Sequence, residues 1–386
     1  MMVFILIPWF HPAYKAGGPI QSVASMVKLL ENESLEFSIF CSNKDLDGSL
    51  VPPPHDRWVQ YSVNTKVWYS SDDRIVPLLE DEIEKQHPSS LYIVGLYDLN
   101  YNFKPLLHFK NVKKIISVRG MLHPGALSQK SFKKKLYLAF WKLVGWHKKN
   151  LFHVTDVKEK EFVLKVFGTS TPVAIADNFP LLFTPAKMPL KEPGMLKLIS
   201  IALISPMKNH LPVLEALKKV GSWHLAVSSE QEAGVNVNIE YNIYGPVKDK
   251  NYWEKCKDLI KTMPSHIVVK YHGAVSPSAI EGALELSHIF IMPSKSENFG
   301  HSIIEALSAG RPVITSNATP WNNLEVSKAG INVNAENENE LVDAIRFFAD
   351  MNQETLEEWS LSANHYAVNA VNVDTIKEQY RELFKL

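Results

Sequence analysis

Cysteine is nearly absent from this sequence. Only Cys41 and Cys256 occur among 386 residues, so the fold cannot depend on a disulfide framework, and we expect a reducing, cytoplasmic compartment. Long hydrophobic runs are also missing, because none approaches the roughly 18 apolar residues that a membrane-spanning helix requires. The apolar start, MMVFILIPWF, has neither a basic beginning nor a small-residue cleavage site. It therefore predicts a first core strand over 3–7 and not a signal peptide.

Acidic residues are missing from one long segment, although the formal net charge of the whole chain is zero. No Asp or Glu lies between Asp98 and Asp156, whereas the same segment holds eleven lysines and Arg119. This uneven distribution predicts an anionic partner for that part of the surface. Metal ligands are not expected, because no group of His, Cys and carboxylates has the required spacing. Asp45-x-Asp47 resembles a metal motif, but the glycine that follows favours a solvated turn.

What the sequence does contain is a regular alternation of short apolar runs and amphipathic stretches. This pattern predicts parallel sheets covered by helices on both faces, and the length suffices for two domains. Strands are predicted at 2–7, 35–41, 91–95, 113–118, 151–155, 172–176, 196–204, 222–228, 239–244, 266–272, 288–292 and 312–316. Helices are predicted at 19–31, 73–87, 128–149, 157–167, 210–220, 250–262, 276–286, 300–309, 336–349, 353–369 and 374–385. A proline-rich stretch predicts a linker, which gives domains 1–180 and 195–370, the linker 181–194 and a terminal helix in 371–386.

The segment 293–321, PSKSENFGHSIIEALSAGRPVITSNATPW, is the most informative part of the chain. A strand pattern, a glycine loop, a helix and a second strand follow one another around it. In an open parallel sheet, ligands bind at loops that follow the carboxyl ends of strands, and a helix that begins there offers N–H groups to an anion. Glu297 and Glu305 flank this helix start, where carboxylates can accept hydrogen bonds from hydroxyl groups. An anion site between two such carboxylates suits a nucleotide-diphosphate sugar.

This segment resembles the signature of the retaining glycosyltransferases of family 4, of the bacterial cell-surface polysaccharide type. The order P-S-x-x-E-N-F-G-x-x-x-x-E-A-L-x-x-G-x-P-V-I, followed by T-P-W, is matched almost letter for letter, and weaker similarity extends through most of the chain. The resemblance implies the GT-B fold, an α/β architecture of two Rossmann-like domains with parallel sheets facing each other across a cleft. It also implies that the C-terminal helix crosses back to the first domain, and that the reaction needs neither metal nor cofactor.

The resemblance assigns roles to particular residues. It implies that Glu305 binds the donor ribose, that Glu297 contacts a hydroxyl of the donor sugar at the reacting centre, and that Lys208 contacts the diphosphate. The alternative for Lys208 is a solvated loop lysine. Further donor-binding residues are expected in the glycine loop and helix start, in an x-G-P turn and in a glycine pair after the first strand, namely Asn298, Phe299, Gly300, His301, Gly245, Gly17 and Gly18. The x-G-P turn and the glycine pair are alternatively plain turns.

Two positions depart from the family pattern. Leu203 stands where the family has an arginine that contacts the diphosphate. Three explanations are open: Lys208 and the helix start suffice, another cation substitutes, or donor binding is weakened or altered. Arg119 stands where many members have a histidine near the reacting sugar, and His123 follows four residues later. We predict that Arg119 holds an anionic acceptor or the leaving diphosphate, because a guanidinium after a buried strand needs an anionic partner. His123 either takes the place of the family histidine or is a structural or surface histidine.

Residues 130–149, KSFKKKLYLAFWKLVGWHKK, combine seven lysines with several aromatic residues. Phe132, Leu136, Phe140 and Leu143 recur at helical spacing. A basic helix with aromatic residues is typical of an element attracted to an anionic membrane surface. The alternative is an ordinary helix with a solvated lysine face and its aromatic side chains in the core. No nucleic-acid-binding motif is recognised, so nucleic acid is not an expected partner.

Together with the patterns above, the resemblance implies a retaining hexosyltransferase that moves a sugar from a UDP- or GDP-sugar to a glycan or lipid-linked glycan acceptor. We expect it in the cytoplasm, peripheral on the inner face of the cell membrane. One alternative is a nucleotide-sugar epimerase of the same fold, and another is a sugar-nucleotide-binding protein with little catalytic activity. A third is a hydrolase in which Glu297 and Glu305 form an acid–base pair, but the glycine loop and Lys208 would then have no use.

Overall fold

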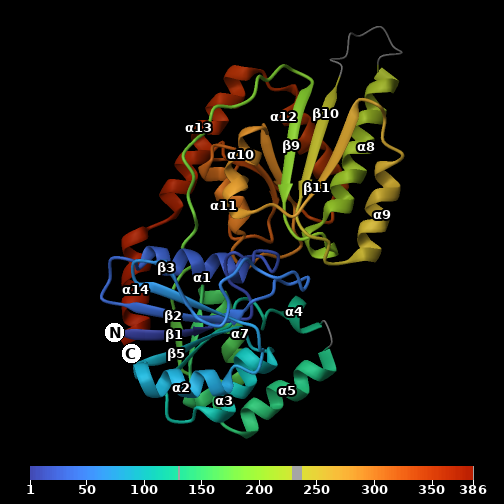
Figure 1. Ribbon diagram of the computed structural model, residues 1–386. Helices are drawn as coiled ribbons and strands as arrows, with labels where there is room; N and C mark the ends of the chain where they lie inside the picture. Colours follow the sequence, from blue (N-terminus) through green and yellow to red (C-terminus); the bar gives the residue numbers. More distant parts are fainter. Residues whose placement is uncertain (129–130, 228–236, 386) are drawn as a thin grey trace. The chain divides into compact units, whose positions relative to one another are not determined.

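The structure is a computed structural model that describes residues 1–128, 131–227 and 237–385. The chain forms two compact units, which we call the N-terminal unit (Met1–Phe179 with Asn372–Leu386) and the C-terminal unit (Pro180–Val371). Each unit contains a central sheet with helices on its faces (Figure 1). The predicted architecture of two α/β domains with parallel sheets is therefore confirmed.

The N-terminal unit is built on an eight-stranded sheet with the order β3-β4-β2-β1-β5-β6-β7-β8. Its strands are β1 (Met2–Leu6), β2 (Glu36–Ser42), β3 (Trp58–Ser62), β4 (Thr65–Ser70), β5 (Ser90–Val94), β6 (Lys114–Ser117), β7 (Leu151–Val154) and β8 (Val173–Ile175). β3 runs antiparallel to β4, and the other neighbouring strands pair in parallel. The central strands are almost continuously apolar and buried, because helices cover both faces of a parallel sheet.

The helices of the N-terminal unit are mostly short. They are α1 (Gly18–Leu29), α2 (Val76–Gln86), α3 (Lys104–His108), α4 (Pro124–Ser128), α5 (Ser131–Leu143), α6 (Trp146–Lys149), α7 (Val157–Phe167) and α14 (Val373–Lys385), with a π-helical turn, η1 (Leu99–Phe103), before α3.

The last helix, α14, belongs to the N-terminal unit although it follows the whole C-terminal unit in sequence. Its apolar face is buried there through Ile376, Tyr380, Leu383 and Phe384. The guanidinium of Arg381 also donates two hydrogen bonds to the carboxylate of Glu33, at 2.9 and 2.6 Å. Burial of each large apolar side chain contributes about 1.5–3 kcal/mol, whereas a partly exposed ion pair contributes at most about 1 kcal/mol. The apolar face therefore fixes α14, and the predicted return of the last helix to the first domain is confirmed.

The C-terminal unit contains a six-stranded parallel sheet with the order β11-β10-β9-β12-β13-β14. Its strands are β9 (Met195–Ile201), β10 (Asn238–Tyr244), β11 (Ile267–Gly273), β12 (Ile289–Met292), β13 (Val313–Ser316) and β14 (Gly330–Val333). Its helices are α8 (His210–Val227), α9 (Lys250–Ile260), α10 (Ile280–Glu285), α11 (His301–Ser308), α12 (Glu338–Asp350) and α13 (Gln353–Ala370), with short 3-10 turns at Pro206–Lys208 and Pro277–Ala279. Two adjacent central strands, β9 and β12, carry the loops that form the candidate site.

Several sequence-based assignments were wrong. The strand expected at 222–228 is absent, because 222–227 continue α8 and residue 228 lies outside the described residues; a short apolar run does not distinguish a buried helix from a strand. The expected helix 128–149 is divided into α4, α5 and α6, with Gly145 at φ 73° before α6, and residues 129–130 lie outside the described residues. Sequence analysis also missed β3, β4, η1, α3 and β14.

A close approach between two loops makes Gly245 essential to the C-terminal unit. Its φ is +140°, and an added Cβ would lie 1.8 Å from the carbonyl oxygen of Ala202. We expect Gly245→Ala to lower the free energy of unfolding by roughly 3 kcal/mol or more, because both the backbone strain and the collision must be relieved. Urea denaturation of the full chain measures this loss.

Gly282→Ala is the matched control. Gly282 lies in α10, and a Cβ there would meet no atom within 4 Å. Alanine is favoured over glycine in a helix by up to about 1 kcal/mol, so the control should be neutral or slightly stabilising. Equal losses in both variants would contradict the steric account.

Candidate functional site

The loops that follow β9 and β12 contact each other at the carboxyl end of the C-terminal sheet. The N–H of Lys295 donates a hydrogen bond to the carbonyl of Met207 at 2.9 Å. The Lys208 ammonium forms an ion pair with the Glu297 carboxylate, and these side chains are only 21% and 10% exposed. Since β9 and β12 are neighbours in the sheet, the structure brings together two predicted site residues that are far apart in sequence.

The start of α11 offers backbone donors next to this ion pair. Gly300 is the N-cap residue and has a φ of 77°. Among the described residues, the N–H groups of Phe299, Gly300 and Ser302 have no hydrogen-bond acceptor. The first N–H groups of any helix lack intrahelical partners, and with the helix dipole they attract an anion. A lysine and a helix start therefore supply positive potential side by side.

The loop before α11 is anchored firmly. The Thr315 hydroxyl donates to the carbonyl of Met292 at 2.9 Å, and the N–H of Glu297 donates to the carbonyl of Ala318 at 3.1 Å. The indole of Trp321 donates to the carbonyl of Phe299 at 2.6 Å. β13 and the segment that follows it thus hold the loop, and the tryptophan at the T-P-W end of the motif supplies one of these contacts.

Glu305 lies within α11 and is only 3% exposed. Burial raises the pKa of its carboxyl group from 4.5 to about 7. Its side chain has no hydrogen-bond partner among the described residues, so nothing in the chain offsets the loss of hydration. A buried carboxylate without a partner is suited to accept hydrogen bonds from a ligand.

The remaining predicted residues of the C-terminal unit surround this centre. The rings of His301 and Phe299 lie 4.7 Å apart, and Asn298 is half-buried in the same loop. Gly245 follows β10, and its N–H donates to the carbonyl of Gly273 at 2.7 Å.

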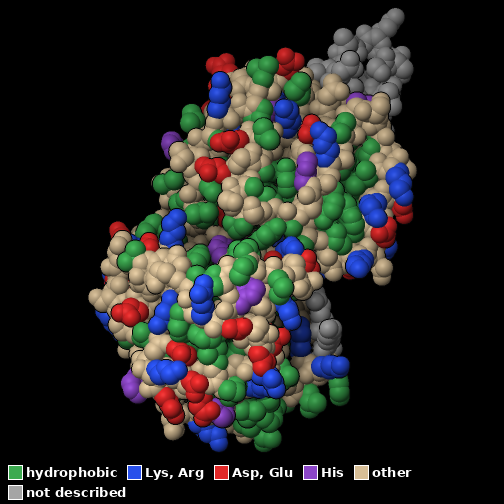
Figure 2. Space-filling model, in the orientation of Figure 1, with side chains coloured by type: hydrophobic (Ala, Val, Ile, Leu, Met, Phe, Trp, Pro, Cys, Tyr) green, Lys and Arg blue, Asp and Glu red, His purple; other side chains and the backbone are tan. Residues whose placement is uncertain are grey.

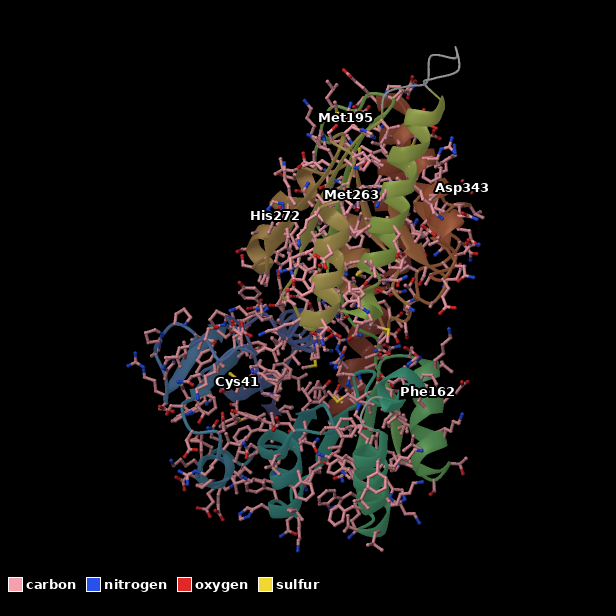
Figure 3. The ribbon with its side chains drawn as sticks, turned by 90° about the vertical axis from the view of Figure 1, so that its right-hand side faces the viewer. Cys41, Phe162, Met195, Met263, His272 and Asp343 are labelled. Carbon is pink, nitrogen blue, oxygen red and sulfur yellow. The ribbon has the colours of Figure 1, made fainter. Side chains whose placement is uncertain are left out.

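In the loop after β9, the half-buried Leu203 occupies the position where the family resemblance implies an arginine. Lys208 is the only lysine or arginine in this loop. Nearby, the strand ends of β10 and β11 carry an aromatic pair. The ring of Tyr244 stacks on that of His272, labelled in Figure 3, at 4.4 Å.

The predicted glycine pair lies in the N-terminal unit, at the start of α1. Gly17 is the N-cap residue with a φ of 77°, and a Cβ on Gly17 or Gly18 would meet no atom within 4 Å. The preceding loop is held by the buried carboxylate of Asp45, which accepts hydrogen bonds from the N–H groups of Tyr14 at 3.0 Å and Lys15 at 3.2 Å. The interpretation of Asp45 as part of a solvated turn was wrong, because backbone donors 30 residues away cannot be inferred from local composition.

Arg119 also lies in the N-terminal unit, where its guanidinium makes internal contacts. It donates hydrogen bonds to the side-chain oxygen of Asn178 and, at 3.0 Å, to the hydroxyl of Tyr92. The same hydroxyl is bonded at 2.6 Å to His153, whose other ring nitrogen is bonded to a carbonyl. Burial lowers the pKa of His153 to about 3, so this histidine stays neutral. Arg119 is thus hydrogen-bonded to neutral oxygens, and its buried Nε has no hydrogen-bond partner among the described residues. The anionic ligand that we predicted for it stays a prediction.

His123 is attached to the chain around it. Its Nδ1 accepts a hydrogen bond from the N–H of Gly125 at 3.1 Å, and its ring packs edge-on against Phe162 at 5.1 Å. These contacts favour the structural alternative for His123.

Glu159, near the start of α7, supports the turn that contains Gly120. Its buried carboxylate accepts hydrogen bonds from the N–H groups of Gly120 and Thr155. The N-cap side chain of α7 is that of Asp156, which accepts a hydrogen bond from the N–H of Glu159. A glutamate three residues after an Asp at a helix start is the only sequence signal available for this arrangement.

Known proteins share the fold described above. Residues 187–365 match the family described as glycosyl transferases group 1. Sucrose-phosphate synthase from Thermosynechococcus elongatus has a TM-score of 0.71 at 14% identity, over 100% of this chain and 98% of the synthase. Anabaena HepE in complex with UDP and glucose has a TM-score of 0.67 at 14% identity, over 100% and 99% of the two chains. WaaG, a glycosyltransferase involved in lipopolysaccharide biosynthesis, has a TM-score of 0.65 at 12% identity, over 100% and 99%. No curated protein sequence matches the chain.

At such low identities the structural matches show the fold, which is the predicted GT-B fold. The family match covers most of the C-terminal unit and includes Lys208, Glu297, Glu305 and α11. The chain therefore has the GT-B fold of its neighbours, and its residues 187–365 match the glycosyl transferases group 1, which supports a glycosyltransferase.

Proposed function

We propose that the protein is a retaining hexosyltransferase that transfers a sugar from a nucleotide-diphosphate sugar, of UDP or GDP, to a glycan or lipid-linked glycan. The observation that carries the proposal is the Lys208–Glu297 ion pair beside the start of α11, with the buried Glu305 in that helix. The family match over 187–365 supports it, and the similar fold of HepE is found in complex with UDP-glucose.

The diphosphate would bind at the start of α11. The N–H groups of Phe299 and Gly300 supply donors, and Lys208 supplies a full positive charge. An ammonium group has three donors, so Lys208 can keep its contact with Glu297 while it donates to a phosphate oxygen. These groups stabilise the negative charge that develops on the leaving diphosphate, which is an electrostatic contribution to catalysis. The absence of an arginine at 203 makes this lysine more important here.

The two carboxylates would bind hydroxyl groups on either side of the diphosphate. Glu305 would accept hydrogen bonds from the ribose, which supplies the partners that its buried carboxylate lacks in the chain. Glu297, held by Lys208, would accept from a hydroxyl of the donor sugar and orient the reacting carbon. We propose attack on the same face as departure, without a protein nucleophile and without a metal ion.

We assign the acceptor to the N-terminal unit. The backbone at Gly17 and Gly18, which we predict to bind the donor, is open enough for a ligand to approach closely. Asp45 would act as a positioning residue, because it fixes the loop that ends at these glycines. The contacts of Arg119 with Tyr92 and Asn178 favour a positioning role for this arginine as well. We place the enzyme in the cytoplasm, peripheral on the inner face of the membrane.

Lys208→Gln tests the diphosphate site. We expect UDP-glucose to bind roughly 10- to 100-fold more weakly, because a hydrogen bond to a charged group is lost. Lys295→Gln removes the same charge from the neighbouring loop, where the lysine is 47% exposed, and should leave the affinity within about twofold. Isothermal titration calorimetry measures both. Equal weakening by the two variants would mean that only the general charge of the region matters, and unchanged binding in Lys208→Gln would remove the proposed site.

The pH dependence of binding tests Glu305. Ribose hydroxyls favour the ionised carboxylate, so UDP-glucose binding should release a proton from a group whose pKa is about 7. Affinity should then be constant above this pH and fall below it, approaching about tenfold per pH unit. UDP-glucose does not itself titrate in this range, since both of its phosphates are esterified. Titrations in buffers of different ionisation enthalpy detect the proton directly.

Glu305→Gln should abolish both the pH dependence of the affinity and the proton release, whereas Glu354→Gln, at an exposed position of α13, should retain them.

The pH dependence of folding stability provides a separate check on Glu305. Because burial raises the pKa of Glu305 in the folded state above 4.5, the ionised carboxylate destabilises the fold above about pH 7, and this cost vanishes as pH falls below about 4.5. The Gln variant should therefore be more stable than the wild type at pH 8, by up to about 3 kcal/mol. A pH dependence of UDP-glucose affinity that persists in Glu305→Gln would contradict the ribose assignment.

A further inference from the structure

Helix α5 presents apolar side chains to solvent. Phe132, Leu136 and Leu143 are 79%, 66% and 85% exposed. In Figure 2, hydrophobic and Lys/Arg side chains gather at the lower right edge of the N-terminal unit, where Figure 1 places α5. Single exposed leucines are ordinary on protein surfaces, but several on one helix face indicate an interaction site.

These three side chains form one stripe, which we call the outer stripe of α5. They stand at positions i, i+4 and i+11, which fall within about 40° of one another around a helix. The opposite face is attached to the N-terminal unit, where Leu138 and Trp141 are buried and the hydroxyl of Tyr137 donates to the carbonyl of Leu96 at 2.8 Å. The helix is therefore apolar on two opposite faces. The inner face packs against the N-terminal unit, and the outer stripe faces solvent.

Lysines flank the outer stripe on both sides. Lys133 lies on one side, and Lys135 and Lys142 on the other, and all three are exposed. The lysine of the inner side behaves differently, since Lys134 donates to the carbonyl of Ala126. No acidic residue occurs in the sequence between Asp98 and Asp156 to neutralise this edge. An apolar stripe between rows of cations matches the interface of an anionic bilayer, with acyl chains below and phosphates beside it.

We propose that α5 docks the protein in the plane of an anionic membrane surface, with the outer stripe inserted among the acyl chains. In the described part of the chain, no helix combines the length and apolarity needed to cross a bilayer, so this contact is superficial. A second copy of the chain is a poorer occupant, because a symmetric contact would bring the lysine rows together. Nucleic acid is anionic as well, but its phosphate backbone has no apolar layer in which the exposed Phe132 and leucines could be buried.

Vesicle flotation of the full chain tests the proposal without any nucleotide or acceptor, so its outcome is independent of the donor site. The vesicles are phosphatidylcholine with or without phosphatidylglycerol. One variant replaces the stripe (Phe132→Ser, Leu136→Ser, Leu143→Ser), and another neutralises its flanks (Lys133→Gln, Lys135→Gln, Lys142→Gln). The matched controls lie in the C-terminal unit at exposed positions: Leu286→Ser, Leu361→Ser, Val368→Ser for the first, and Lys250→Gln, Lys255→Gln, Lys261→Gln for the second.

We expect the wild type and both controls to bind only the anionic vesicles. The lysine variant should lose on the order of 100-fold in affinity, and the stripe variant a similar or larger factor, while both keep the wild-type melting temperature. Binding that is equal in the lysine variant and its control would overturn the proposal, as would absent binding by the wild type. A change of oligomeric state in the stripe variant, seen by light scattering with vesicle binding unchanged, would assign the face to a second copy instead.

Discussion

The ion pair between Lys208 and Glu297 is the contact on which the site depends. It joins the loops after β9 and β12, adjacent strands at the centre of the C-terminal sheet. Parallel strands place their carboxyl ends at one edge, and the second loop is fixed by Thr315 of β13 and by Trp321, which follows β13. The ordinary packing of an α/β sheet thereby positions a cation, a carboxylate and a helix start together.

Charge compensation explains the composition of this site. Glu297 has a cation within the protein, whereas Glu305 is buried without one and has a raised pKa as a result. A nucleotide sugar would supply what each lacks, with hydroxyl groups for the carboxylates and a diphosphate for Lys208 and the free N–H groups of α11. In the proposed reaction, the binding energy of the donor would therefore be concentrated at the atoms where charge moves during transfer. The N-terminal unit differs, since the Tyr92 hydroxyl links Arg119 to His153 by hydrogen bonds within the chain, although the buried Nε of Arg119 has no hydrogen-bond partner among the described residues.

The sequence was informative where structure is local. The strands around 288–292 and 312–316 and the helix between them follow from apolar runs interrupted by glycine and proline. The motif made Glu297 and Glu305 candidates for the site. Contacts between distant segments were not predictable in this way. The partners of Arg119 come from distant segments, Tyr92 from β5 and Asn178 from the stretch after β8. The carboxylate of Asp45 accepts hydrogen bonds from backbone N–H groups of an earlier loop. The apolar run at 222–228 was misassigned because its periodicity fits a helix and a strand equally well.

The most direct measurement is a crystal structure of the protein with UDP-glucose. The account predicts the diphosphate at the start of α11, within hydrogen-bonding distance of the Phe299 and Gly300 N–H groups and the Lys208 ammonium, with the ribose hydroxyls on Glu305. A nucleotide bound elsewhere in the C-terminal unit, with Glu305 still buried and without a partner, would contradict it.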